Sequence, residues 1–222
     1  MEVALDETLL AEVPNAKFGI IHYENITIGH SPQMLKGRLQ LFQESLFFEL
    51  ENKNISEIPE IKEWRSVFKR LGKDPNRYRH SAEALYRRVK KQKYMPSINS
   101  ATDINNFFSL KYRIPLGIYD KDLIKGNVMI RKGRIEESYL GLNGRENSVE
   151  NLPVAADDAG PFGSPFVDSM RTAVTPAAKN AVQIVYLPLS IEKEEAEKLV
   201  ESLASMFTHI NGGNSRFSIL SN

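Results

Sequence analysis

Apolar residues along the chain recur with the two spacings expected of a protein that mixes strands and helices. Residues 16–23, AKFGIIHY, form an apolar run of the length of a buried strand, and residues 180–189, NAVQIVYLPL, form another. Elsewhere apolar residues recur every three or four positions, which is the spacing of a helix with one buried face. The sequence therefore predicts buried strands set among amphipathic helices.

Three helices are predicted between residues 31 and 93 from this periodicity and from capping residues. The first has Ser31 as N-cap and Pro32 as first helical residue, and it buries a stripe of apolar side chains: Leu35, Leu39, Phe42, Leu46 and Leu50. The second spans Glu60–Leu71 and ends at Gly72. The third follows a Ser81 cap, ends before Met95-Pro96, and buries Ala84, Leu85 and Val89.

Two more helices and a strand-rich segment complete the prediction. One helix spans about 100–111, and the last follows a Ser190 cap and ends at Gly212-Gly213. The apolar stripe of the last helix contains Leu199, Val200, Leu203, Met206 and Phe207. Between residues 115 and 175, short apolar runs alternate with Gly, Asn and Asp clusters, as in a segment of short strands. No internal repeat or long linker interrupts the chain, so one α+β domain over 1–222 is the simplest interpretation.

Composition excludes several classes of protein. The chain has 222 residues, of which 41% are hydrophobic and 26% charged, as in ordinary globular proteins. It contains no cysteine, which excludes disulfides and thiolate ligands and fits a cytoplasmic protein. The first 14 residues carry four acidic residues and no basic one, unlike a secretory signal. No apolar run approaches the roughly 18–20 residues of a membrane helix.

Charge is unevenly distributed although the net charge is only +1. The window 65–93 holds two acids, Asp74 and Glu83, and 11 basic residues: Arg65, Lys69, Arg70, Lys73, Arg77, Arg79, Arg87, Arg88, Lys90, Lys91 and Lys93. Its net charge is therefore 11 − 2 = +9, which leaves 1 − 9 = −8 for the remainder. Such a segment either binds a polyanion or merely solvates two surface helices.

Strong catalytic and metal-binding motifs are absent from the sequence. It has no glycine-rich phosphate loop, no GxSxG elbow and no HExxH, and its four histidines lack metal-ligand spacing (His22, His30, His80 and His209). Adjacent carboxylates Asp157 and Asp158 precede Gly160, an arrangement that suits either a cation or, more commonly, a turn. We therefore expect no metal and no cofactor.

Three stretches are candidates for a binding site. Arg77, Tyr78 and Arg79 directly precede the Ser81-capped helix, whose N-terminus would favour an anion. The stretch FVDSMRTAVTP (166–176) contains four polar residues, Asp168, Ser169, Arg171 and Thr172. These residues line a site, or Asp168 and Arg171 simply pair with each other. In INSATDINNFF (98–108), amides interrupt a helical apolar pattern. There Asn99 and Asp103 fit caps or local braces, and Asn105 and Asn106 fit ligand contacts.

Taken in order from Ala82 to Val185, these stretches resemble a known family. They are MPSINSATDINNFFSLKYRIPLGIYDKDLIKGNVMIRKG, ADDAG and RTAVTPAAKNAVQIV. Together they resemble the tRNA-binding and editing domain of the phenylalanyl-tRNA synthetase β-subunit, the B3/B4 domain. The leading YRHSAEALYRR looks like the version found in free-standing members. Nothing resembles the catalytic, B5 or anticodon-binding parts of the synthetase, so we do not expect a complete synthetase.

The resemblance implies a compact three-layer α/β domain. It places the B3/B4-like core at about 75–188, with flanking helices in 31–71 and 190–211. In the bacterial synthetase this domain hydrolyses tyrosine wrongly attached to phenylalanine tRNA. A second pocket that hydrogen-bonds the hydroxyl of the substrate discriminates strongly, because a substrate without it leaves buried polar groups unpaired. Hydrolysis then needs an oriented water and donors for the developing oxyanion, and the ribose hydroxyl of the substrate can assist.

Carried over residue by residue, the resemblance places Asn106 where the bacterial pocket has an asparagine and Asn105 where it has a threonine. Gly117 stands where that pocket has a histidine, and Ile184 stands near the position of the glutamate that reads the tyrosine hydroxyl. The glycine-rich turn that lines the pocket is represented loosely by GPFGSPF. The expected substrate-binding residues are Asn105, Asn106, Gly117, Asp168, Ser169, Arg171 and Thr172; no catalytic residue is assigned.

Three functions are compatible with the sequence. The first is a stand-alone cytoplasmic domain that binds tRNA or aminoacyl-tRNA and hydrolyses misacylated aminoacyl-tRNA in trans, an editing-like esterase. The second is a non-catalytic RNA- or amino-acid-binding module on the same fold, suggested by the missing histidine and glutamate; a scaffold without an RNA role is a third. The expected RNA-binding residues are Arg77, Tyr78, Arg79, Arg87, Arg88 and Lys90.

Overall fold

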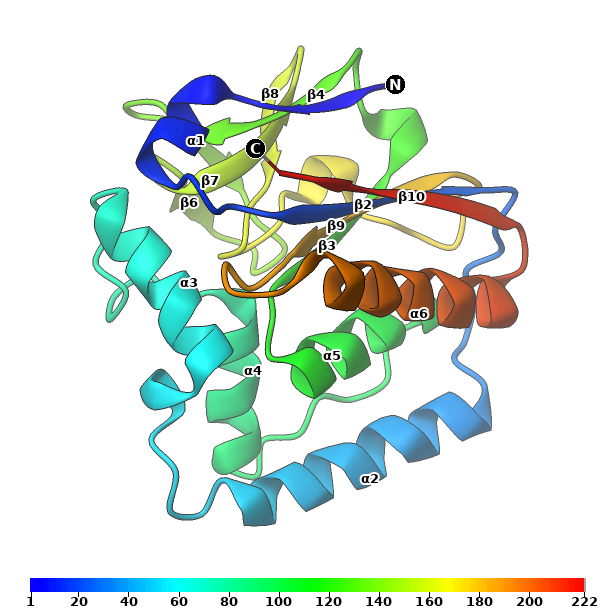
Figure 1. The fold of residues 1–222 in the computed structure, drawn as a ribbon. Helices are drawn as coiled ribbons and strands as arrows, with labels where there is room; N and C mark the ends of the chain where they lie inside the picture. The colour runs from blue at the N-terminus through cyan, green and yellow to red at the C-terminus, as the bar shows by residue number, and fades with distance from the viewer. Residues whose placement is uncertain (222) are drawn as a thin grey trace.

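Two four-stranded sheets lie one above the other, and helices cover the outer side of one of them (Figure 1). The computed structural model describes residues 1–221. The central sheet has the order β10(Asn214–Leu220)-β2(Phe18–Glu24)-β9(Ala181–Tyr186)-β3(Leu116–Asp120), with every pair antiparallel. The outer sheet has the order β1(Val3–Leu5)-β4(Val128–Lys132)-β7(Pro153–Asp157)-β8(Gly160–Gly163). In the outer sheet β1 runs parallel to β4, and the other pairs are antiparallel.

The helices form the third layer. They are α2(Gln33–Glu49), α4(Ser81–Lys90), α5(Ser100–Tyr112) and α6(Lys193–Asn211), together with α3(Pro59–Arg70), which reaches along the side of the molecule to the core between the two sheets. The short α1(Glu7–Glu12) contacts the outer sheet. Three short 3₁₀ turns, η1(Ile55–Glu57), η2(Lys121–Leu123) and η3(Met170–Thr172), and the hairpin β5(Ser138–Leu140)–β6(Glu146–Ser148) complete the fold. Helices α5 and α6 pack on the central sheet, and α2 packs on α5 and α4 from outside (Figure 1). The expected three-layer α+β fold is confirmed.

Strands β2, β3 and β9 of the central sheet are buried on both faces, which explains their continuous apolar runs. Ile21 and Tyr23 of β2 belong to the core beneath the helices, whereas Phe18 and Ile20 belong to the core between the two sheets. The fully buried Trp64 of α3 extends the second core and donates its indole N–H to the Tyr186 carbonyl at 3.1 Å. The central sheet therefore separates two apolar cores.

The starts of the helices lie within two residues of the sequence prediction, whereas α4 ends at Lys90, earlier than predicted, and all three predicted serine caps are wrong. Ser31 instead donates its hydroxyl to Asp103 at 2.6 Å, and Pro32 precedes α2. His80 caps α4 with its ring nitrogen, and Ser81 is the first helical residue. Ser190 bonds Glu63 while Glu192 precedes α6. The hydroxyls of Ser31 and Ser190 each donate a hydrogen bond to a carboxylate of another helix, and the sequence alone does not reveal these partners.

The buried face of α4 also differs from the prediction. Ala84 is exposed and Leu85 is only partly buried, whereas Ala82, Glu83, Tyr86 and Val89 face the interior. The face is rotated because Glu83 is buried against arginines, so a charged residue occupies a core position. The sequence also gave no sign of β1, α1 and β10. The edge strand β10 is mostly exposed, so it lacks a strong apolar pattern.

Within residues 1–221, no helix is long and apolar enough to cross a membrane. No group of three or more His, Asp or Glu side chains in the same range is placed to share a metal ion.

Candidate functional site

A hollow lined by basic side chains lies between α4 and the loops that follow α3 and β8. Its volume is about 520 Å³, and we call it the basic hollow; it is lined by Arg77, Arg79, Ala84, Arg87, Arg88, Lys91, Lys93, Asn143, Phe166 and Val167. Six of these residues are cations and none is an acid. Five of the six are exposed, and Arg87 is partly buried. The predicted basic segment is therefore gathered on one concave surface.

Local structure explains how the cations converge. Ala84, Arg87, Arg88 and Lys91 are spaced three and four residues apart, so they share the outward face of α4 and the turn that follows it. The small side chain of Ala84 leaves room at the centre of this face. Arg77 and Arg79 come from the turn that starts at Gly72, whose φ of +96° suits glycine, and that is braced by Asp74.

Two residues expected to bind RNA lie outside the lining of the basic hollow. The Tyr78 ring packs edge-on against Phe166 at 5.5 Å and carries the Lys73 ammonium 4.4 Å from its centroid, so it supports the turn. Lys90 donates its ammonium to the Lys53 carbonyl at 2.7 Å, beside a neighbouring hollow that Arg87 and Lys91 also line. Their RNA contacts stay a prediction, and the geometry places the two side chains at the margin.

Two backbone N–H groups at the N-terminus of α4, where an anion was expected, already have partners within the protein. The His80 ring accepts from the Glu83 backbone N–H at 3.3 Å, and Ser81 donates its backbone N–H to the Pro165 carbonyl at 2.7 Å. Glu83 adds a carboxylate within the first turn. Phosphate would therefore be held by side chains of the basic hollow and not by the helix end.

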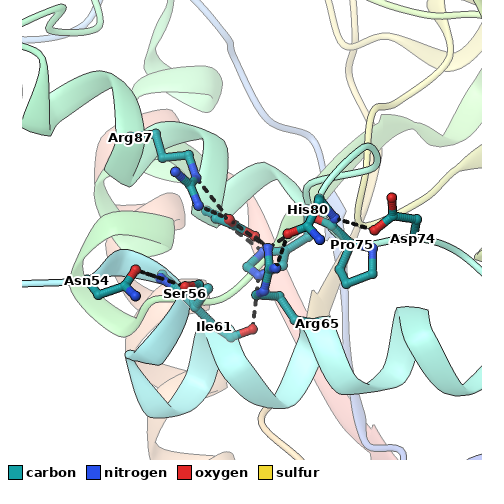
Figure 2. A network of polar contacts seen from close by, with 10 residues as sticks. Asn54, Ser56, Ile61, Arg65, Asp74, Pro75, His80 and Arg87 are labelled. Atoms are coloured by element: carbon teal, nitrogen blue, oxygen red, sulfur yellow. Dashed lines mark hydrogen bonds and ion pairs between the residues drawn. The ribbon is translucent and has the colours of Figure 1, made fainter.

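Arg65 and Arg87 belong to a polar network that joins α3 to α4 (Figure 2), and Glu83 is the shared partner of these two arginines. Its side chain is fully buried, and its carboxylate accepts from Arg65 at 3.0 Å and from Arg87 at 2.8 Å. Arg65 also donates to the Pro75 carbonyl and to the Asn76 amide oxygen. Two guanidiniums thus satisfy one buried carboxylate, and Arg87 is held in position at the edge of the basic hollow.

His80 makes the network sensitive to pH. Its Nδ1 accepts from Glu83 and its Nε2 lies 3.3 Å from the Ile61 carbonyl, so the neutral tautomer protonated on Nε2 satisfies both groups. Burial lowers the pKa of His80 from 6.5 to about 4. Because this folded-state pKa is depressed, the stability His80 contributes is present above pH 6.5 and is lost as pH falls toward 4.

We expect a His80→Asn variant to separate this effect from other titrations, because asparagine can cap the helix without titrating. From pH 6.5 down to 4, the wild type should lose about 3 kcal/mol of unfolding free energy relative to the variant. The comparison with the variant is needed because the raised pKa of Asp168 makes the folded state more stable as pH falls over the same range. Urea unfolding across this pH range measures the difference. Parallel pH profiles of the two proteins would contradict the assignment.

A second group of candidate residues surrounds the buried Tyr119 of β3. The Tyr119 hydroxyl donates to Asp168 Oδ1 at 2.7 Å. A Cβ added at Gly117 would lie 1.9 Å from this hydroxyl oxygen, and one added at Gly163 would lie 2.2 Å from it. Both glycines therefore face the Tyr119 ring, which fills the space that the sequence assigned to a pocket beside Gly117.

Asp168 is the most unusual acid of this group. Burial raises its pKa to about 7, and Tyr119 and the Ser164 backbone N–H partly oppose the rise. Its second oxygen, Oδ2, accepts no hydrogen bond from residues 1–221. A carboxyl group with this pKa exchanges a proton readily near neutrality, as a general base or acid requires. Since its pKa is raised on folding, its contribution to stability is lost as pH rises through 7.

The other residues of the 166–176 stretch serve the local structure. Arg171 makes a bidentate pair with Asp157 at 2.8 and 2.9 Å, so the alternative of an Asp168–Arg171 pair is wrong. Asp157 and Asp158 lie at the turn between β7 and β8, as expected. Ser169 caps η3, whereas the Thr172 hydroxyl is buried without a partner. Their substrate contacts stay a prediction.

The two amides of α5 differ in their availability. Asn105 donates to the Leu116 carbonyl at 3.1 Å and accepts from Gln183 at 2.6 Å, so it ties α5 to β3 and β9. Asn106 is partly exposed, and its side chain makes no hydrogen bond within residues 1–221. Asn99 caps α5 and Asp103 braces three neighbouring groups, as expected. Asn106 is therefore the amide that is free for a ligand.

The structure does not join the predicted substrate residues into one site. No hydrogen bond within residues 1–221 links Asn105 or Asn106 to Asp168. Asp168 instead adjoins the basic hollow: Phe166 and Val167 line it directly before Asp168, and the Asp168 carbonyl accepts from Leu142, next to the lining residue Asn143. Sequence reasoning missed Phe166 and Asn143, although GPFGSPF carried an aromatic residue beside the polar stretch.

Comparison with known proteins gives the following relatives. The sequence model of the B3/4 domain matches residues 63–209. An uncharacterized protein of Bacillus subtilis, YhzB, is 37% identical over 214 residues, which is 96% of each chain. The phenylalanine–tRNA ligase β-subunit of Paramagnetospirillum magneticum is 37% identical over 65 residues, 29% of this chain and 8% of that subunit.

The Fusobacterium nucleatum ligase β-subunit is 29% identical over 104 residues, 45% of this chain and 13% of that one. Among solved structures, an N-terminal fragment of the phenylalanyl-tRNA synthetase β-subunit from Pyrococcus horikoshii aligns with 97% of this chain and 50% of that fragment, at a TM-score of 0.46 and 16% identity. The chain thus spans nearly all of the Bacillus protein but only a small part of the ligase subunits.

Proposed function

Because the chain belongs to the B3/4 domain family, we propose that it binds tRNA and hydrolyses misacylated aminoacyl-tRNA in trans. The observation that carries the proposal is the basic hollow, which gathers six cations and no acid within about 520 Å³. The ligase subunits supply the link to tRNA, since they belong to phenylalanine–tRNA ligases. The hydrolytic step rests on Asp168, beside the hollow.

The basic hollow suits the backbone of an RNA strand. Arg79, Lys91 and Lys93 have no ion-pair or hydrogen-bond partner for their side chains within residues 1–221, so they can pair with phosphates without losing internal contacts. Neutralising phosphates releases bound counterions, so affinity should fall steeply with salt. The partly exposed Phe166 offers an aromatic surface in the same hollow for an unpaired base.

Asp168 gives the site a group suited to ester hydrolysis. In the proposed reaction a water attacks the ester carbonyl, its proton passes to Asp168 Oδ2, and the bond to the ribose oxygen breaks. Asp168 returns this proton to that oxygen, which leaves as the free ribose hydroxyl, and the amino acid leaves as a carboxylic acid that loses its own proton to solvent. Tyr119 holds the other oxygen of Asp168 and so orients it.

Incubation with a panel of mischarged tRNAs tests the proposal. We expect accelerated ester loss for at least one aminoacyl group, and an Asp168→Asn variant to lower that rate about 100-fold while tRNA affinity is kept. Asp158→Asn is the matched control, because Asp158 is an exposed aspartate at the turn between β7 and β8. Intact tRNA binding with no acceleration for any aminoacyl group would refute the hydrolase.

A non-catalytic binding module is the second candidate function, and the Tyr119 ring favours it. This ring occupies the space between Gly117 and Gly163, so an aminoacyl side chain can enter there only if the ring moves. Binding of tRNA without hydrolysis in the same assay would support this candidate.

A further inference from the structure

Helix α2 is apolar on two opposite sides. Leu35, Leu39, Leu46 and Leu50 face the core beneath the central sheet. On the outer side three large apolar side chains, Met34, Leu41 and Phe48, are 58%, 67% and 72% exposed. Seven residues span two helical turns, so these three lie in one line, which we call the α2 stripe. Figure 1 shows α2 at the margin of the molecule, with one side against α4 and α5.

The charges of α2 indicate what covers the stripe. Its N-terminal half carries Lys36 and Arg38, and its C-terminal half carries Glu44 and Glu49. A second copy of α2 packed antiparallel would place basic halves against acidic halves, whereas a parallel arrangement would place like charges together. The stripe is also symmetric about Leu41, with Met34 and Phe48 seven residues to either side. Both features favour a two-fold, self-complementary contact.

Small residues beside the stripe allow close approach. Gly37 and Ser45 lie four residues to either side of Leu41, and a Cβ at Gly37 would meet no atom within 4 Å. A groove of about 280 Å³ runs along this flank, lined by Gln33, Lys36, Gly37, Leu39, Gln40, Gln43, Met95, Pro96 and Ser97. Antiparallel packing about Leu41 sets Phe48 of the second copy against Met34, a sulfur–aromatic contact.

We propose that the α2 stripe is the interface of a homodimer, in which α2 packs antiparallel on α2 of a second copy with Leu41 at the two-fold axis. The helix has 17 residues, or about 25 Å of length, so the interface is small. A reversible dimer in the micromolar range is therefore expected. The proposal does not depend on RNA binding or hydrolysis, and its test does not involve RNA.

Sedimentation velocity over a concentration series measures the dimer. Leu41→Glu should raise the dissociation constant by about tenfold or more, because two glutamates would meet at the axis. Ile135→Glu, at an apolar residue 81% exposed between β4 and β5, should leave it unchanged. A mixture of Leu41→Glu and Leu41→Arg should form a heterodimer. A wild type that stays monomeric at about 100 μM, or a Leu41→Glu variant that still dimerises, would overturn the proposal.

Engineered cysteines test the antiparallel geometry, since the natural chain has none. Under mild oxidation, Leu41→Cys should cross-link to itself. Met34→Cys and Phe48→Cys should cross-link when mixed, and neither should do so alone. Cross-linking of Met34→Cys with itself in place of the mixture would show a parallel contact and overturn the arrangement. Binding of another protein to the stripe, with no self-association, would likewise overturn it.

Discussion

Replacing Arg79 and Arg88 together by alanine is expected to weaken tRNA binding by about 10- to 100-fold at physiological salt. Both residues are exposed and line the basic hollow, so the change removes two cations without touching either core. The dependence of log affinity on log salt should also become shallower by about 1.5–2, because two fewer phosphates are neutralised. Filter binding or fluorescence anisotropy with labelled tRNA over a salt series measures both quantities.

The matched control for this prediction is the double variant Arg134→Ala/Arg216→Ala. Both control arginines are exposed and lie outside the basic hollow, so the net charge of the protein changes equally. Its affinity and salt dependence should stay close to those of the wild type. Equal losses in the two double variants would mean that only overall charge matters, and the basic hollow would then have no specific role.

Replacing Glu83 by alanine is expected to lower the free energy of unfolding by about 3–4 kcal/mol. Glu83 is fully buried between Arg65 and Arg87, whose side chains are 16% and 39% exposed (Figure 2). Removing the carboxylate leaves two guanidiniums facing each other with their shared acceptor gone, which costs more than the pair contributes when intact. Urea denaturation followed by circular dichroism gives the value.

Glu57→Ala is the comparison for Glu83→Ala. Glu57 pairs with Lys62 at 2.8 Å, but both side chains are about 60% exposed, and surface pairs of this kind contribute little to stability because solvent screens them. The Glu83 variant should therefore be clearly less stable than the Glu57 variant. If the Glu83 variant were no less stable than the Glu57 variant, the network would not be what holds α3 to α4.

Periodicity and apolar runs predicted the layers of the fold but not its polar details. The run AKFGIIHY appears as β2 because both faces of the central sheet are buried, and α5 begins at the predicted Ser100 under its Asn99 cap. The prediction of serine caps was wrong because capping depends on which side chain lies nearest to the helix end in three dimensions. His80 took the place of Ser81 since its ring, packed beneath α3, can reach the Glu83 backbone.

In the candidate site, too, the surface charge could be predicted from the sequence, but the buried polar contacts could not. The charge of the 65–93 window indicated the basic hollow, because the spacing of exposed arginines along one helix is enough to place them on the same face. The pocket beside Gly117 was harder to foresee. That glycine suggested an opening, but a side chain two residues along the same strand, Tyr119, points into it and bonds Asp168. A missing side chain in sequence therefore does not imply an empty space in the fold.

Hydrogen–deuterium exchange in the presence of uncharged tRNA tests most directly whether the basic hollow is where RNA binds. We expect slowed exchange in the backbone amides of 77–93 and 142–143 and of Phe166 and Val167, with β10 and α6 unchanged, and loss of this protection in the Arg79→Ala/Arg88→Ala variant. Protection confined to other surfaces, with 77–93 exchanging as in the free protein, would contradict the account.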